Sequence, residues 1–237
     1  MSTIKSFEAF REVLRGTKPG DRDFFRGEAR DDYTLIPKIG RLTTVRPKHP
    51  DGKPKLDLRY TVEVVGEQKI FERFKKGALP LVSIVPRDDW EWLALAQHHG
   101  LPTRLLDWTA NPLIALYFAV GTKALDVSCD AVFYHLSTKS GLVDTQSHAP
   151  FDVDVGLFSA SVVTNRIRSQ SGFFTIQGDI HRSLSELWNP KRLQRYVIPS
   201  DAREPLRQEL LLYGVNHYSV FPDLDGLCRH LQDQVND

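Results

Sequence analysis

The sequence has no long apolar run and almost no net charge. Nowhere in its 237 residues is there anything close to the roughly 20 consecutive apolar residues that a membrane-spanning helix needs. The first ten residues, MSTIKSFEAF, lack the charged, apolar and small-residue order of a secretory signal peptide. The 31 Lys and Arg nearly cancel the 30 Asp and Glu, which excludes a strong overall field for nucleic acid or membranes but not local patches. We therefore expect no membrane partner.

Cysteine is scarce, and the familiar catalytic signatures are missing. Cys129 and Cys228 make no metal-binding spacing and lie in apolar contexts, which predicts reduced core residues of a cytoplasmic protein. No G-x-S-x-G elbow, Walker sequence, H-E-x-x-H or C-x-x-C occurs. His98 and His99 are adjacent, so on a helix their side chains would diverge by about 100° and could hardly ligate one metal. We expect no metal site.

The sequence does contain a mixture of helical and strand patterns. Apolar spacing, caps and terminators predict helices at 6–14, in the second half of 60–78, and at 87–99, 111–121, 203–215 and 221–235. Aromatic and β-branched runs predict short strands at 24–29, 131–136, 173–176 and 193–199. Residues 40–57 are rich in Pro, Lys, Arg and Gly, which predicts a surface loop. Because these elements alternate without a regular β-α-β period or a linker, we expect a single α+β domain over residues 1–237.

Residues 97–111 place many hydrogen-bonding groups beside an apolar helix. The sequence QHHGLPTRLLDWTAN ends one predicted helix and begins the next, and its glycine and proline predict a polar turn between them. The start of a helix offers N–H donors to anions, and Arg104 could fork onto a phosphate or carboxylate. The alternative is structural. In that case Arg104 and Asp107 form a buried pair that holds the loop, while Gln97 and His98 satisfy backbone carbonyls.

Two further segments place an arginine near a glycine. In FFRGEA, two phenylalanines anchor a predicted strand, Arg26 projects, and Gly27 lets another group approach the backbone closely. The alternative is an ion pair between Arg26 and Glu28 or another carboxylate. In NRIRSQSGFFTIQG, Arg168 and Gln170 precede an aromatic strand. Here the alternative is an exposed basic edge.

Taken in order, four segments resemble the FRG domain family: FFRGEA, WLALAQHHGLPTRLLDWTANPLIALYFAV, NRIRSQSGFFTIQG and FPDLDGLCRHL. The family is named for its Phe-Arg-Gly triplet, here Phe25, Arg26 and Gly27. The resemblance covers most of the chain, with a core at about 20–235. FRG domains occur in bacteria and phages, often in defence or mobile-element settings, and a distant relation to ADP-ribosyltransferases is suspected. The resemblance implies mixed helices around a small β-sheet that could be split, ADP-ribosyltransferase-like if that relation holds.

The resemblance also implies residue roles. In ADP-ribosyltransferases an early strand carries an arginine or histidine that holds NAD, and a later segment carries a glutamate that works on the ribose and the acceptor. Here the similar later segment has Gln170, which can orient a ribose hydroxyl but cannot accept a proton at neutral pH. The expected catalytic residues are Arg26, Gln170, and His98 or Asp107 as the base. The residues expected to hold NAD are Arg26, Gln97, Thr103, Arg104 and Arg168.

Several functions remain open at this level. One is an ADP-ribosyltransferase-like enzyme that consumes NAD or a related nucleotide and modifies a protein or nucleic acid in bacterial or phage defence or toxicity. Another is a non-enzymatic module that binds a nucleotide or nucleic acid, which the missing glutamate favours. A third is an inhibitor that binds a host protein. The near-zero net charge argues against tight non-specific binding to nucleic acid.

Overall fold

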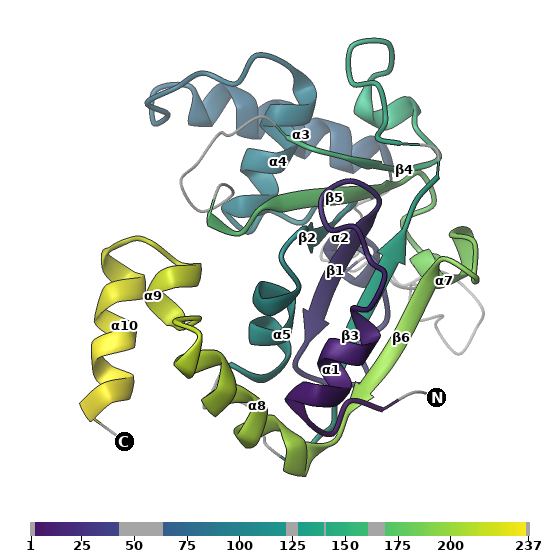
Figure 1. The fold of residues 1–237 in the computed structure, drawn as a ribbon. Helices are drawn as coiled ribbons and strands as arrows, with labels where there is room; N and C mark the ends of the chain where they lie inside the picture. Colours follow the sequence, from purple (N-terminus) through teal and green to yellow (C-terminus); the bar gives the residue numbers. More distant parts are fainter. Residues whose placement is uncertain (1–2, 43–63, 122–127, 140, 161–168, 236–237) are drawn as a thin grey trace, which may run out of the picture.

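The protein has an α+β fold built on one six-stranded antiparallel sheet (Figure 1). The computed structural model describes residues 3–42, 64–121, 128–139, 141–160 and 169–235. In sheet order the strands are β4 (Val155–Phe158), β5 (Gly172–Gln177), β2 (Leu105–Thr109), β1 (Asp23–Glu28), β3 (Ala131–Ser137) and β6 (Leu193–Ile198). The helices are α1 (Phe7–Val13), α2 (Lys38–Leu42), α3 (Val64–Ala78), α4 (Asp89–His98), α5 (Pro112–Val120), η2 (Pro150–Asp152), α7 (Leu184–Leu187), α8 (Ser200–Leu212), α9 (His217–Val220) and α10 (Leu224–Val235). No helix in these ranges is long and apolar enough to cross a membrane.

Local signals set the ends of the helices that position the site. The Asp88 side chain accepts a hydrogen bond from the backbone N–H of Glu91 and begins α4, which ends before Gly100 at φ +83°. The Asn111 side chain accepts from the N–H of Leu113 and begins α5. The helices predicted at 87–99 and 111–121 are confirmed, because these caps depend only on neighbouring residues.

The sheet consists of two three-stranded halves joined by a narrow seam. Within β4–β5–β2 and within β1–β3–β6 the strands pair along most of their length. Between the halves, β1 and β2 have a single registered pair, Phe25 with Thr109. Figure 1 shows β4 and β5 running at a steep angle to β3 and β6. The described residues therefore form one continuous sheet with a narrow seam, and not the split sheet that the resemblance allowed.

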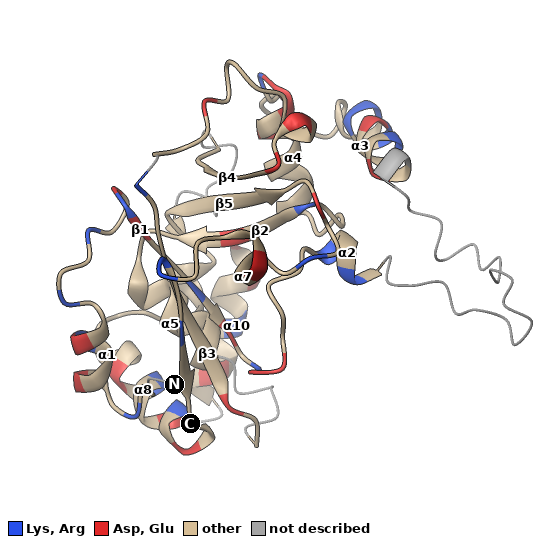
Figure 2. Cartoon of the chain, turned by 90° about the vertical axis from the view of Figure 1, so that its right-hand side faces the viewer, with Lys and Arg blue, Asp and Glu red and all other residues tan. Residues whose placement is uncertain are grey.

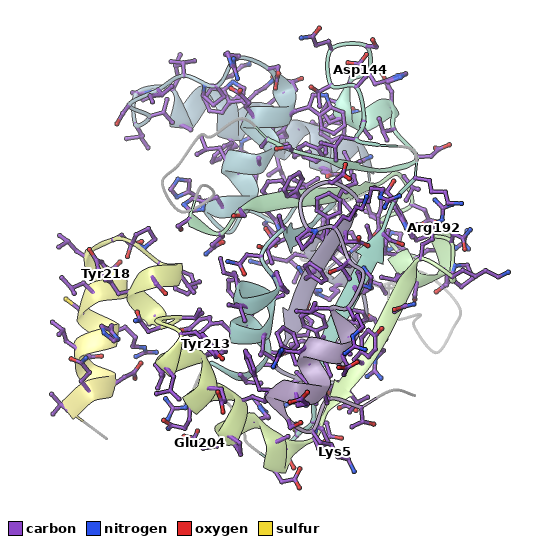
Figure 3. All side chains as sticks on the ribbon, in the orientation of Figure 1. Lys5, Asp144, Arg192, Glu204, Tyr213 and Tyr218 are labelled. Atoms are coloured by element: carbon purple, nitrogen blue, oxygen red, sulfur yellow. The ribbon has the colours of Figure 1, made fainter. Side chains whose placement is uncertain are left out.

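Helices cover one face of the sheet. Directly opposed residues of paired strands share a face, which shows which side chains lie under these helices. Phe25 and Phe133 pack under α1, α5 and α8, and on the same face Leu105 and Phe174 pack under α3 and α4. Charged residues lie outside these clusters; Lys5, Asp144 and Glu204 project from the surface (Figure 3). Figure 2 shows acidic and basic residues interspersed along the chain, in keeping with its small net charge.

The other face of the sheet is concave and holds a third cluster. Phe24, Leu106, Trp108 and Leu136 form it together with Leu35, from the segment between β1 and α2, and Leu184 of α7. The ring centroids of Phe24 and Phe173 are 4.6 Å apart, although β1 and β5 are separated by β2. Strands two places apart lie about 10 Å from each other in a flat sheet, so the sheet must bend towards this face.

Several predictions need correction. β2 and β4 were not predicted. β2 lies in the expected polar turn, and its three apolar and two polar residues are too few to show a strand period. The helix expected from residue 203 begins at Ser200. The core position expected for the cysteines is wrong for the exposed Cys228, while Cys129 is half-buried and the two form no disulfide. Most of the loop expected at 40–57 lies outside the described residues, and its first part forms the end of α2.

Candidate functional site

A cleft opens where β1 and β2 separate. Past the Phe25–Thr109 pair, antiparallel pairing would match Arg26 with Trp108 and then Gly27 with Asp107, but neither pair is formed. The Asp107 carbonyl oxygen instead accepts a hydrogen bond of 2.7 Å from Nη1 of Arg26. The cleft has a volume of about 430 Å³. Its lining consists of Phe25, Arg26, Gly27, Glu28, Ala29, Tyr33, Gln97, His98, Asp107, Trp108, Thr109, Phe118 and Gln170.

Each residue of the Phe-Arg-Gly triplet has a separate structural task. Phe25 is fully buried beneath α5 and forms, with Thr109, the single registered pair of the seam. Arg26 points to the opposite face and reaches across to β2. Gly27 allows α5 to lie against β1, because a Cβ at this position would be 1.8 Å from the backbone oxygen of Ala115. The three residues therefore contact three different parts of the fold: Phe25 the core, Arg26 the neighbouring strand β2, and Gly27 the helix α5.

Arg26 is held between two carboxylates. Its Nε and Nη2 both donate to Oε1 of Glu28, the Nε bond at 2.8 Å, and its Nη1 lies 3.8 Å from Oδ2 of Asp107. Burial by itself lowers the pKa of the Arg26 guanidinium, but the charges of Glu28 and Asp107 outweigh it and raise this pKa above its ordinary value. Arg26 is therefore permanently charged, and the ion pair with Glu28 that the sequence left open is present.

A chain of side-chain hydrogen bonds orients Asp107. The buried Thr103 Oγ1 accepts from the N–H of Leu105 and donates its single proton to Oε1 of Gln97 at 2.6 Å. This bond turns the Gln97 amide so that Nε2 donates to Oδ2 of Asp107 at 2.8 Å. The Asp107 side chain remains 60 % exposed. The result is a fixed, solvent-accessible carboxylate beside a buried guanidinium.

His98 and Gln170 close the end of the cleft next to β5. His98 lies in the last turn of α4, where its ring meets that of His99 edge-on at 4.9 Å. The Gln170 side chain donates to the carbonyl of Val220 at 3.3 Å. A side pocket of about 40 Å³ shares His98, Asp107, Trp108 and Gln170 with the main cleft. The structure thus places five expected site residues around one cleft: Arg26, Gln97, His98, Asp107 and Gln170.

Thr103 and Arg104 do not belong to this lining. Thr103 lies behind Gln97 and positions its amide. Arg104 is 2 % exposed, pairs with Glu67 of α3 at 2.7 Å and stacks over the ring of Phe151. Both sequence interpretations of Arg104, as a phosphate fork in the cleft and as a partner of Asp107, are therefore wrong. Arg168 lies outside the described residues.

Some lining residues could not have been found from a motif. Glu28 was considered only as a partner of Arg26, although a strand period of two places both on one face. Tyr33 and Phe118 reach the cleft from a loop and from the outer turn of α5, and no local pattern marks them. Trp108 also borders the cleft, although it is only 3 % exposed, and its Nε1 donates to Oγ1 of Thr175.

Neither a metal cluster nor a redox pair accompanies the cleft in the part of the chain that the structure describes. No group of three or more His, Cys, Asp or Glu side chains in that part could hold a metal ion. The chemistry that the described residues offer is that of carboxylates, an imidazole, amides and one guanidinium. These groups can bind and orient a polar ligand, stabilise developing positive charge, and accept a proton.

Comparison with known families gives one result. Residues 21–127 match the model of the FRG domain. The match includes β1, α4 and β2, the elements that carry the triplet, Gln97, His98 and Asp107, and it also includes α5. Gln170 lies beyond it. No curated protein and no solved structure matches the chain.

Proposed function

We propose that the cleft binds NAD or a related nucleotide and that the protein is an ADP-ribosyltransferase-like enzyme. The observation that carries this proposal is the convergence of Arg26, Gln97, His98, Asp107 and Gln170, from four separate segments, on one cleft. Its volume of about 430 Å³ falls in the range of small-molecule sites, roughly 300–1,000 Å³. The family resemblance supports a role in bacterial or phage defence or toxicity, in the cytoplasm.

The proposed reaction is transfer of ADP-ribose from nicotinamide to an acceptor. The bond between nicotinamide and C1′ of the ribose breaks, and nicotinamide leaves with the bonding electron pair. Positive charge develops on the ribose, and the carboxylates of Asp107 and Glu28 at the cleft would stabilise it. An acceptor oxygen or nitrogen forms the new bond to C1′ and gives up its proton to the exposed carboxylate of Asp107.

Arg26 and Gln170 serve binding in this proposal. The guanidinium of Arg26 retains N–H groups beyond those bonded to Glu28 and Asp107, and these could donate to a ligand phosphate. The Gln170 amide can orient a ribose hydroxyl without taking a proton. Asp107 therefore supplies the base that the glutamine cannot.

A non-enzymatic nucleotide-binding module is the second candidate. This candidate is favoured because the polar side chains of the cleft already form hydrogen bonds to other protein groups. Arg26 is bonded to Glu28 and to the Asp107 carbonyl, and Gln170 is bonded to Val220. Such a site is suited to holding a ligand, and it lacks the catalytic glutamate of the transferases that the family resembles.

Nicotinamide release from NAD by the purified protein separates the two candidates. We expect release by the wild type, loss of release in Arg26→Ala and Asp107→Asn, and partial release in Arg26→Lys, which keeps the charge but loses the fork. Arg15→Ala is the matched control, because Arg15 is exposed and pairs with Glu12, outside the cleft lining. Melting temperatures are measured alongside.

The outcomes are distinct. NAD binding without release, with protein and nucleic-acid acceptors present, would support the binding module. Absence of both binding and release would reject both candidates. Loss of release together with a large loss of thermal stability in Arg26→Ala would assign this arginine a purely structural role at the seam.

A further inference from the structure

A second groove lies on the same face of the sheet as Arg26. It has a volume of about 560 Å³ and is formed by the segment after β1, by β3 and β6, and by the turn before α7. Tyr134, Leu193, Arg195 and Val197 form its floor on the sheet. Its wall comes from residues 31–35 together with Asp130, Ser183 and Ser185.

The groove is adjacent to the cleft. Arg26 of β1 is directly opposite Tyr134 of β3, which is directly opposite Arg195 of β6, so the three side chains form a row on one face. Two strand spacings, about 10 Å, separate the ends of this row. Tyr33, 48 % exposed, lines both the cleft and the groove. A ligand in the groove is therefore one side chain away from the cleft.

Acidic groups outnumber basic ones in the groove. Asp31, Asp32 and Asp130 line it, and Arg195 is the one cation among its described lining residues; Arg30, which lies over the ring of Tyr33, pairs with Asp32. Arg195 donates to the backbone oxygen of Asp31 at 3.0 Å and to the side chain of Tyr134, so protein groups already engage it. The groove thus presents two exposed carboxylates beside hydroxyl groups, on a protein whose total charge is close to zero.

We propose that this groove seats the acceptor, and that the acceptor is a polypeptide segment with lysine or arginine side chains. This inference rests on the proposed function, since it assigns the acceptor of the same reaction. An acceptor nitrogen or oxygen passes Tyr33 and forms a bond to C1′ of the ribose, nicotinamide leaves with its electron pair, and the acceptor proton goes to Asp107. Nucleic acid is disfavoured, because the exposed carboxylate of Asp31 would repel its phosphates.

Direct binding tests the groove without any need for catalysis. The probes are a fluorescein-labelled flexible peptide with three lysines and three arginines, a matched peptide with glutamates in their place, and a single-stranded oligonucleotide of similar length. Fluorescence anisotropy is measured for the wild type, for Asp31→Lys, and for the control Asp21→Lys. Asp21 is an exposed carboxylate outside both the groove and the cleft, so the two substitutions change the net charge equally.

We expect the basic peptide to bind most tightly, and Asp31→Lys to weaken its binding about fivefold, as expected for an exposed charge contact. Asp21→Lys should have a smaller effect, and the melting temperatures of both variants should match that of the wild type. Equal effects of the two substitutions, or tighter binding of the oligonucleotide or the acidic peptide, would overturn the proposal.

Catalysis provides a second readout that keeps the two proposals apart. With NAD and the basic peptide, Asp31→Lys should lower ADP-ribose transfer to the peptide while leaving nicotinamide release into water unchanged. Release that occurs with transfer unaffected by Asp31→Lys would reject the groove and keep the enzyme. Groove-dependent peptide binding without any release would reject the enzyme and keep the groove as a peptide site.

Discussion

Replacing Gly27 by alanine tests the contact that holds α5 against β1. The added Cβ would lie 1.8 Å from the oxygen of Ala115 and 2.7 Å from the nitrogen of Ala119. Both atoms belong to the backbone, so no side chain can turn away. Strand and helix must move apart by about 1.2 Å before the first contact reaches 3.0 Å, the shortest distance that real Cβ atoms show.

The cost of this movement is large because its surroundings are close-packed. Ala115 and Leu116 are fully buried, and α5 follows directly from β2, so the helix cannot slide freely. Overpacking of a core lowers the free energy of unfolding by about 1–3 kcal/mol. Because Gly27→Ala must displace backbone atoms, we expect a loss of ~3 kcal/mol. For a chain of this size that corresponds to a fall in melting temperature of about 6–12 °C.

Gly77→Ala is the matched control. Gly77 lies in α3, and its Cβ would meet nothing within 4 Å. The same chemical change should there stabilise the helix by up to ~1 kcal/mol, because alanine loses less conformational freedom than glycine. Thermal and urea unfolding of both variants measure whether stability falls in Gly27→Ala and rises in Gly77→Ala. A Gly27→Ala protein that melts with the wild type would refute the close contact between β1 and α5.

Four further predictions concern the core and the site. Leu116→Asp places an unpaired carboxylate in the core at a cost of several kcal/mol, and circular dichroism should show no cooperative unfolding; a normal melt would place α5 at the surface. Glu67→Gln leaves the Arg104 charge buried without its partner and should cost about 3–5 kcal/mol in urea unfolding, whereas an unchanged midpoint would contradict the pairing. Thr103→Val removes the hydroxyl that orients the amide next to Asp107, so nicotinamide release should fall while NAD affinity changes little; equal release would show that this orientation is unimportant. Gln170→Glu should raise release if this position corresponds to the transferase glutamate, and a decrease would argue against that correspondence.

Features set by neighbouring residues could be predicted from the sequence. The caps at Ser6 and Asn111 and the apolar run of α5 were read correctly, because a side chain that bonds to a nearby N–H leaves a local pattern. The buried ion pair of Arg104 could not be predicted, since Glu67 is 37 residues away and its position on α3 depends on the tertiary fold. The same limit applies to Tyr33, whose loop gives no sign of what it faces.

The strand β2 shows why the site itself was only partly predictable. Asp107 was singled out for its charge, but its five-residue strand was taken for a turn, because three apolar and two polar residues are too few to establish a period. Without β2 there is no seam, and without the seam there is no reason for Arg26 to meet Asp107. The residue types therefore indicated a polar site, while its geometry came from the pairing of distant strands.

The seam has a mechanical consequence. With a single registered pair between β1 and β2, the two halves of the sheet are coupled through α5, through the third hydrophobic cluster and through the bond from Arg26 to the Asp107 carbonyl. A ligand that binds the remaining N–H groups of Arg26 can leave this bond in place while it makes new contacts with both walls, so it adds a connection between the halves. Occupancy of the cleft and the stiffness of the whole sheet are therefore linked. The amide protons of β1 and β2 beside the seam, measured by hydrogen exchange, are where a bound ligand would leave its clearest trace.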